Sequence, residues 1–319
     1  MSVYNNAAHL PAAIESILAQ SFGDFEFLIV NDGSSDESGD IIDRYAAGDR
    51  RIRAFHQPNL GLIASLNRML AEARAPLIAR MDDDDIALPA RFERQLAFLA
   101  AHPDHGVVGT WSSCIDKHGA PHLDQCRDQP TSHQAFLRQL ENGPLLIHPS
   151  VLMRRDLVLA IGGYRPAYQH AEDYDLWLRL SERTRLTTMP ERLLLYRHSD
   201  AQVSSRHIVA QATATAIAWL AHLERAAGRP DPTDGLDRPP AFHDLDRLFG
   251  AGAARAVRSK VARTILHSPL ALRGQGLDLV LDHVRDGGAR EGLWRTAGRL
   301  VKWGEPGRAL RLATALAKH

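Results

Sequence analysis

The first 110 residues alternate short apolar runs with stretches whose apolar residues recur at helical spacing. Phe25–Val30 and Ala75–Ala79 are uninterrupted or nearly uninterrupted apolar runs, whereas Leu10–Gln20 and Arg91–Ala101 place apolar residues three and four apart. Continuous apolar runs are typical of parallel strands that are covered on both faces. A strand–helix alternation of this kind predicts an α/β fold, a Rossmann-like, mainly parallel twisted sheet with helices on both faces.

Polar residues follow three of the predicted strands. Tyr4-Asn5 ends a strand fragment, Asp32 follows Phe25–Val30, and Asp82–Asp85 follow Ala75–Ala79. Because the carboxyl ends of parallel strands share one edge of the sheet, we expect these groups to converge on one crevice. Clustered carboxylates there suit Mg²⁺ or Mn²⁺. The alternative, a solvated acidic turn or a helix N-terminus, does not explain the convergence.

The middle of the chain is less regular. Leu145–Met153 is predicted to be a strand, with His148 before a proline, and Leu193–His198 a last apolar strand. Between them, His170–Leu180 begins with acidic residues and continues as an amphipathic helix. Acidic residues in a first helical turn also stabilise a helix by interacting with its dipole. Their presence alone therefore does not establish a catalytic role.

From about Ser205 the composition shifts toward Ala, Arg and Leu. Gly228–Pro240 is rich in Pro, Gly and Asp and is a candidate linker. Helices are predicted over Leu245–Arg258, Leu277–Val284, Leu293–Leu300 and Ala309–Ala317, several with Arg or Lys opposite an apolar face. Such helices could form a helical cap, an oligomer contact or an interfacial surface on anionic lipid.

Composition narrows the function classes. The 319 residues carry 38 basic and 38 acidic side chains, and this balance argues against a nucleic-acid partner. The two cysteines, Cys114 and Cys126, are expected to be reduced thiols of a cytosolic protein, although they could pair. No apolar window is long enough to span a bilayer, and no signal peptide is expected because His9, Pro11 and Glu15 interrupt the N-terminus. We expect a soluble protein or one at a membrane surface.

The order of these motifs resembles the inverting family-two glycosyltransferases, which have the glycosyltransferase A fold. Each motif is a weak signal alone, but their order and spacing are specific. The resemblance covers roughly residues 1–205, and the segments that carry it are Ser2–Asn5, Phe25–Asp36, Arg80–Asp85, Gly162–Tyr164, Ala171–Trp177, and Leu195–His198 through Val203-Ser204. The family usually has several apolar residues before the position of Ser2. We therefore expect either a short first strand or a start that is placed late.

The resemblance implies transfer of a sugar, with inversion, from a nucleotide-diphosphate sugar to a hydroxyl acceptor. It implies Mn²⁺ or Mg²⁺ as cofactor and Asp173 as the general base. It assigns nucleotide binding to Val3, Tyr4, Asp32, Asn67, Arg80 and Asp82, metal binding to Asp82, Asp84, Asp85 and His198, and acceptor binding to His148, Glu172 and Trp177.

The expected organisation is a catalytic domain over 1–205 and a helical C-terminal region over 206–319 with a linker near 228–240. In the catalytic domain, about 1–110 is the nucleotide-sugar half and about 111–205 the acceptor half. The expected acceptor is a glycan or a lipid-linked molecule of a bacterial surface polysaccharide or glycolipid pathway. By analogy the protein is cytoplasmic, at the inner face of the membrane.

Two other classes remain as alternatives. A metal-dependent nucleotidyltransferase would more often have a Gly-rich basic loop after the first strand, and Asn5–His9 has neither Gly nor Lys. The presence of Asp32, Asp82, Asp84 and Asp173 together argues against a non-catalytic nucleotide-sugar-binding or assembly module. The sequence does not identify the donor sugar or the acceptor.

Overall fold

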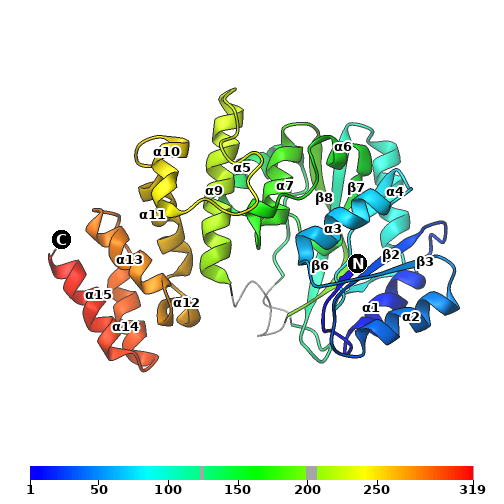
Figure 1. Ribbon diagram of the computed structural model, residues 1–319, viewed down its shortest axis with the longest axis horizontal. Coiled ribbons are helices and arrows are strands. Elements are labelled where there is room, and N and C mark those ends of the chain that lie inside the picture. Colours follow the sequence, from blue (N-terminus) through cyan, green and yellow to red (C-terminus); the bar gives the residue numbers. More distant parts are fainter. Residues whose placement is uncertain (123–125, 199–206, 319) are drawn as a thin grey trace. The chain divides into compact units, whose positions relative to one another are not determined.

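The computed structural model describes residues 1–122, 126–198 and 207–318, and the chain divides into two compact units (Figure 1). The first unit comprises Met1–Arg165 and Glu172–Ser199, and the second comprises Pro166–Ala171 and Asp200–His319. The short segment Pro166–Ala171 thus belongs with the C-terminal unit, although it lies within the predicted acceptor half. The predicted functional halves of the catalytic domain stay a prediction.

The first unit begins with a three-stranded parallel sheet in the order β1-β2-β3. Side chains alternate between the faces of a strand, so Phe27 and Ile29 pack on α1 and α2 while α3 covers the opposite face. The elements are β1 (Ser2–Val3), α1 (Leu10–Leu18), β2 (Phe27–Asp32), α2 (Ser38–Gly48), β3 (Ile52–Gln57) and α3 (Leu62–Glu72).

A second sheet of five strands has the order β4-β7-β6-β8-β5. It is mixed: β6 and β8 run parallel, whereas the other pairs run antiparallel. The strands of this sheet and the helices around them are β4 (Leu77–Ala79), β5 (Ile86–Ala87), α4 (Arg91–Ala101), β6 (His105–Ile115), α5 (His133–Gln139), η1 (Leu140–Asn142), η2 (His148–Ser150), β7 (Leu152–Arg154), α6 (Arg155–Ala160), α7 (Glu172–Ser181) and β8 (Arg185–Arg197).

The predicted α/β fold is confirmed, and most of the predicted elements occur within a few residues of their expected bounds. The strand predicted over Leu145–Met153 is wrong in its first half, where a 3-10 turn, His148–Ser150, precedes the short strand β7. Pro149 explains the difference, because proline has no N–H to donate to a sheet ladder.

The second unit is helical, as predicted. The helix predicted over Leu245–Arg258 is two helices, because Gly250 and Gly252 adopt positive φ angles of 90° that end one helix and precede the next. The unit contains η3 (Pro166–Tyr168), α9 (Ile208–Ala226), η4 (Phe242–Asp244), α10 (Leu245–Phe249), α11 (Ala253–Ile265), α12 (Pro269–Arg273), α13 (Gly276–Arg285), α14 (Leu293–Lys302) and α15 (Pro306–Lys318).

The predicted linker near 228–240 contains no helix or strand and lies inside the second unit. Thr233 is its buried anchor: its hydroxyl lies 2.6 Å from the Tyr168 hydroxyl. The predicted boundary at 205 and the Val203-Ser204 motif lie outside the described residues.

The state of the two cysteines and the membrane-spanning potential of the helices complete the comparison with the sequence-based expectations. Cys114 and Cys126 form a disulfide, so the expectation of two reduced thiols is wrong. Among the described residues, we find no helix with the length and apolar character that crossing a membrane requires.

Candidate active site

The turns that follow β1 and β2 are tied together by side-chain hydrogen bonds. Asn5, whose φ of 51° lies in the left-handed region, donates its N–H to the Ser34 hydroxyl (3.0 Å), and its side-chain oxygen accepts the Ser35 N–H (2.7 Å). Two residues on, the Ala7 N–H donates to the Asp36 carboxylate (3.0 Å). The ends of the two strands therefore form one polar edge, as the sequence predicted.

Asp32 ends β2 and is almost fully buried. Its carboxylate accepts hydrogen bonds from the Gln57 side chain (2.7 Å) and from the backbone N–H groups of Leu60 (2.9 Å) and Gly61 (2.8 Å). These bonds anchor the loop between β3 and α3 at the sheet edge. The role predicted for Asp32, a hydrogen bond to a nucleotide base, stays a prediction.

The acidic run lies between β4 and β5, beside the buried guanidinium of Arg80, which pairs with Asp82. Carboxylate oxygens of Asp82, Asp84 and Asp85 all lie within 4.8 Å of one another. Burial and the neighbouring carboxylates raise the pKa of Asp84 to about 6 and raise that of Asp85 well above its usual value. A divalent cation placed among these carboxylates would favour their ionised forms. The group is therefore a suitable set of metal ligands.

A specific atom supports this fit. Asp85 is fully buried, and one carboxylate oxygen accepts the Arg197 N–H at 2.8 Å. Its other oxygen is buried and has no hydrogen-bond partner among the described residues. An orphaned buried oxygen is costly unless a ligand satisfies it, and a cation held with Asp82 and Asp84 would do so.

Asp83 differs from its three neighbours. It bonds to the Asn6 side chain and the Tyr4 backbone, both beyond the end of β1, while burial and the adjacent acids raise its pKa to about 7. Asp83 therefore joins the acidic run to the first strand rather than to the group of possible metal ligands.

Two arginines that the sequence analysis did not assign hold the backbone of the acidic run. Buried Arg91, on α4, donates to the carbonyl oxygens of Arg80 (2.7 Å) and Val151 (3.2 Å), and burial lowers its pKa to about 9. Arg197, at the end of β8, donates its Nε to the Asp84 carbonyl oxygen (2.8 Å). The position of Arg91 on the apolar face of a predicted helix was the available signal.

Helix α7 brings a second pair of acids to the same site. Burial raises the pKa of Glu172 to about 7 and that of Asp173 to about 6, and the charges of Arg80 and Asp82 act on both groups. Asp173 is partly exposed, and one of its oxygens accepts its neighbour's N–H, that of Tyr174, at 2.7 Å. The structure thus brings Asp173 and Glu172 together with the acidic run.

The remaining residues predicted to bind the nucleotide differ in their exposure and contacts. Val3 is fully buried in the core, whereas Tyr4 is 53% exposed. Asn67 is committed to the backbone of Tyr164, whose N–H it accepts (2.9 Å) and whose carbonyl it donates to (2.7 Å). A Cβ at Gly163 would lie 2.7 Å from the Asn67 oxygen, so this close approach requires glycine. A nucleotide contact by Asn67 stays a prediction.

The predicted acceptor and metal residues outside the acid groups are packed in the protein. His148 is buried, and its Nε2 lies 2.7 Å from the Tyr164 hydroxyl. The Trp177 ring is fully buried, 5.8 Å from the His148 ring. His198, whose N–H bonds to the Ile115 carbonyl oxygen (2.8 Å), is not in the group of possible metal ligands found among the described residues. The roles of His148, Trp177 and His198 stay predictions.

Comparison with known structures addresses the fold. The chain is similar to Staphylococcus aureus TarS 1–349 in complex with UDP-GlcNAc (TM-score 0.59, 14% identity, 99% of this chain and 89% of that one). It is also similar to the mannosyltransferase PcManGT from Pyrobaculum calidifontis in complex with GDP-Man and Mn²⁺ (TM-score 0.51, 17% identity, 99% and 85%). The predicted glycosyltransferase A type fold is confirmed.

Sequence comparison addresses the family. The chain is 36% identical over 186 residues to the putative glycosyltransferase EpsE of Bacillus subtilis, covering 57% of this chain and 65% of that relative. It is 30% identical over 201 residues to the O-antigen biosynthesis glycosyltransferase WbnJ of Escherichia coli, covering 62% and 77%. A family model described as glycosyl transferase family 2 matches residues 1–162. The chain therefore belongs to glycosyl transferase family 2.

Proposed function

We propose that the protein transfers a sugar, with inversion, from a nucleotide-diphosphate sugar to a hydroxyl acceptor with Mn²⁺ or Mg²⁺ as cofactor. One observation carries the proposal. Three carboxylates that suit a cation and a partly exposed carboxylate with a raised pKa, Asp173, lie in one charged site around Arg80 and Asp82. Donor activation and proton removal are the two tasks that such a transfer requires.

The residues divide these tasks. A cation held by Asp82, Asp84 and Asp85 would supply Lewis-acid stabilisation for the negative charge that grows on the leaving nucleoside diphosphate. Tyr4, at the exposed end of β1, and Asp32 are proposed to contact the base. Arg80 is a fixed positive charge beside the diphosphate position.

Asp173 is the proposed general base. With a pKa of about 6, its carboxylate is mostly ionised at pH 7 yet still basic enough to take the proton of an attacking hydroxyl. Asp173 lies in the first turn of α7, near enough to the acidic run for the charges of Arg80 and Asp82 to act on it. We propose that it directs the acceptor hydroxyl to the face of the sugar opposite the leaving group. Inversion at the anomeric carbon follows from this single displacement. Glu172 is proposed to bind the acceptor.

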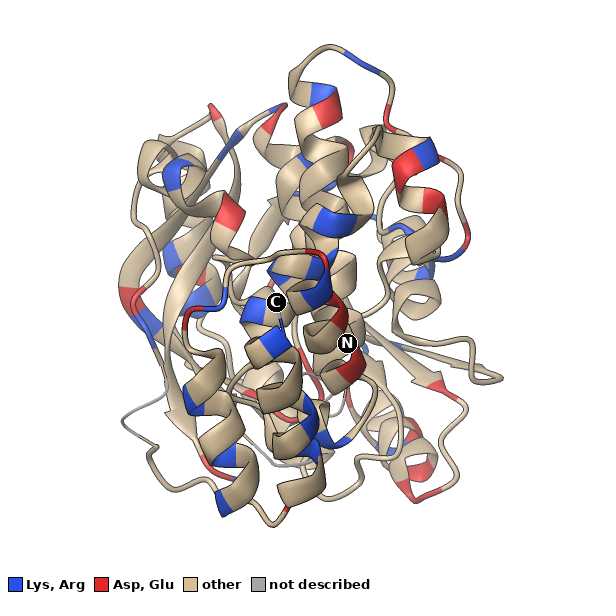
Figure 2. Cartoon of the chain, turned by 90° about the vertical axis from the view of Figure 1, so that its left-hand side faces the viewer, with Lys and Arg blue, Asp and Glu red and all other residues tan. Residues whose placement is uncertain are grey.

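The acceptor is proposed to be a glycan or a lipid-linked molecule of surface polysaccharide synthesis, as the name of WbnJ suggests for that relative. A peripheral contact with the cytoplasmic face of the membrane is proposed through the second unit. Helices α14 and α15 carry Arg and Lys but no acidic residues (Figure 2), and they expose Trp294, Val301 and Leu310. Co-sedimentation with vesicles containing anionic lipid, lost at high salt, would support this contact.

The first experiment measures thermal stability with nucleoside diphosphates and nucleotide sugars, each with Mn²⁺, Mg²⁺ or chelator. A ligand that binds the folded state raises its apparent stability. We expect one nucleotide to give a metal-dependent shift that Asp84→Ala abolishes. Asp278→Asn, which changes an acid whose side chain is 64% exposed, is the matched control and should keep the shift.

The second experiment measures transfer and the anomeric configuration of the product. Asp173→Asn should keep the nucleotide-induced shift and lose about 10³-fold in turnover, because the amide cannot accept the proton. Unchanged turnover in Asp173→Asn, with turnover abolished in Asp84→Ala, would show that another group is the base. A nucleotide sugar that stabilises the protein without transfer to any acceptor would instead favour the non-catalytic binding module.

A further inference from the structure

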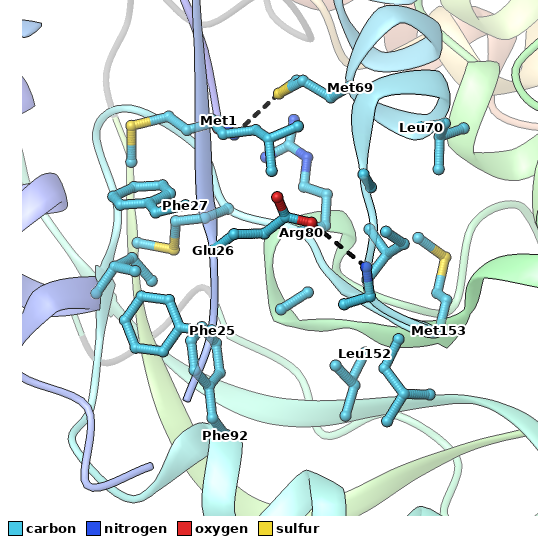
Figure 3. A pocket seen from close by; sticks show the side chains of 18 of the residues that line it. Met1, Phe25, Glu26, Phe27, Met69, Leu70, Arg80, Phe92, Leu152 and Met153 are labelled. Atoms are coloured by element: carbon cyan, nitrogen blue, oxygen red, sulfur yellow. Dashed lines mark hydrogen bonds between the residues drawn. The ribbon is translucent and has the colours of Figure 1, made fainter. Parts of the chain in front are cut away.

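The segment that leads into the acidic run borders a cavity. Arg80 and Met81 line this cavity, which has a volume of about 290 Å³ and lies within the first unit (Figure 3). Figure 3 shows mostly apolar side chains around it, among them Met69, Leu152 and Met153. Apolar side chains donate no hydrogen bonds to backbone carbonyl oxygens. Donors that hold the backbone near the acidic run must therefore come from other elements.

Arg197, at the end of β8, is one such donor. β5 and β8 pair antiparallel with Ile86 opposite Leu195, and this register, continued by two residues, extends to Asp84 and Arg197. The Arg197 Nε donates to the Asp84 carbonyl oxygen (2.8 Å), and the Arg197 backbone N–H donates to the Asp85 carboxylate (2.8 Å). The end of β8 therefore holds two of the three candidate metal ligands.

The same guanidinium also bonds to a turn beside β8. Its Nη1 donates to the carbonyl oxygen of Asp116 (3.0 Å), which directly follows β6, the neighbour of β8 on the side away from β5. The turn is itself held by hydrogen bonds, because the Asp116 carboxylate accepts the N–H groups of His118 (2.8 Å) and Ala120 (2.9 Å). Arg197 thus connects the acidic run to a fixed turn.

The charge and the bonds of Arg197 have opposite effects on a cation at the acidic run. A guanidinium repels a divalent cation, so its charge alone would weaken metal binding. Bonds that orient metal ligands strengthen it, and such groups commonly account for about 10- to 100-fold in affinity. Arg197 is buried, and its planar group presents several donors in a fixed arrangement that suits two carbonyl oxygens at once.

We propose that Arg197 is a positioning residue for the cation site, because it fixes Asp84 and Asp85 in the arrangement that binds Mn²⁺ or Mg²⁺. The inference rests on the proposed function, since it concerns the same cation. Arg197 acts through the two aspartates and touches neither the metal nor the substrate. Replacing its guanidinium should therefore weaken the cation site although all three carboxylates remain.

The test measures the dissociation constant for Mn²⁺ alone, from the electron paramagnetic resonance signal of the free ion, together with Tm without metal. Arg197→Met should weaken Mn²⁺ binding about tenfold or more. Arg197→Lys keeps the charge but not the paired donors, so it should weaken binding less, by about threefold or more. Arg192→Met is the matched control and should keep the affinity, because Arg192 also lies on β8 and bonds to a β6 carbonyl oxygen, that of Ser112.

Mn²⁺ affinity in Arg197→Met equal to or above that of the unchanged protein would overturn the proposal, even if Tm falls, and so would an equal loss in Arg192→Met. If Arg197→Met does not fold, Arg197→Lys carries the test, and an unchanged affinity in that variant contradicts the proposal. Failure of the proposed function gives a different result. The unchanged protein would then bind no Mn²⁺, or would bind it equally well after Asp84→Ala.

Discussion

Two fully buried aspartates in the first unit have opposite surroundings. Asp175, on α7, pairs with the guanidinium groups of both Arg165 and Arg179, and Arg179 also donates to the Gly163 carbonyl oxygen (2.7 Å). Asp85 has one oxygen bonded to a backbone N–H and one without a hydrogen-bond partner among the described residues.

This difference in hydrogen bonding distinguishes Asp175, a carboxylate that stabilises the fold, from Asp85, a carboxylate suited to binding a ligand. The Asp175 cluster satisfies its charges internally and fixes α7 to the preceding turn, which holds the helix that carries Asp173. Asp85 keeps an unsatisfied oxygen beside Asp82 and Asp84, and burial with these neighbours raises its pKa. Buried acids without internal partners are therefore better candidates for ligand binding than buried acids in complete ion pairs.

The largest expected effect is the loss of stability in Asp175→Asn. Removing the carboxylate leaves two guanidinium groups without their shared partner, so we expect the free energy of unfolding to fall by about 3 kcal/mol or more. Urea unfolding measures this change. Asp43→Asn, which disrupts the more exposed pair with His56, is the control and should cost less than about 1 kcal/mol. Similar losses for the two variants would break the comparison.

A smaller effect concerns His148, whose buried ring bonds to a neutral hydroxyl. Burial, with the charge of Arg80, lowers the pKa of His148 well below 6.5. Below about pH 6.5 the unfolded state therefore binds a proton that the folded state does not. As the pH is lowered, this one group reduces the free energy of unfolding by up to about 1.4 kcal/mol per pH unit. Urea unfolding between pH 5 and 7.5 should show a shallower slope in His148→Gln. Parallel slopes in the two proteins would count against this account.

The smallest expected change in stability is that of Asp85→Asn. Because the pKa of Asp85 is raised, an amide of nearly the same shape replaces a carboxyl that resists ionisation, and the free energy of unfolding should change by less than about 1 kcal/mol. The Mn²⁺-dependent rise in Tm should shrink or vanish. A loss comparable to that of Asp175→Asn would place Asp85 among the stabilising carboxylates and remove the distinction.

The sequence predicted the strand ends well because their signals are local. An apolar run followed within three residues by Asp32 or by Asp82–Asp85 marks a strand and its polar edge, and both lie where expected. The failures have local causes too. Pro149 interrupts a predicted strand, and Gly250 with Gly252 divides a predicted helix.

Partnerships between distant residues could not be predicted in this way. Asp173 and Asp175 look alike in the sequence, and the contact that separates them joins Asp175 to Arg165 across a turn. Arg197 reaches Asp85 from 112 residues away, a pairing that no spacing rule indicates. The disulfide between Cys114 and Cys126 is similar, because two cysteines alone do not indicate whether they pair.

Asp83 has a consequence for how the site can change through evolution. Its bonds to the Asn6 side chain and the Tyr4 backbone join the acidic run to the end of β1. A substitution at one partner leaves the other without its hydrogen bond, so effects at positions 6 and 83 should not add independently. Among related proteins we therefore expect the two positions to co-vary, even though neither belongs to the group of possible metal ligands.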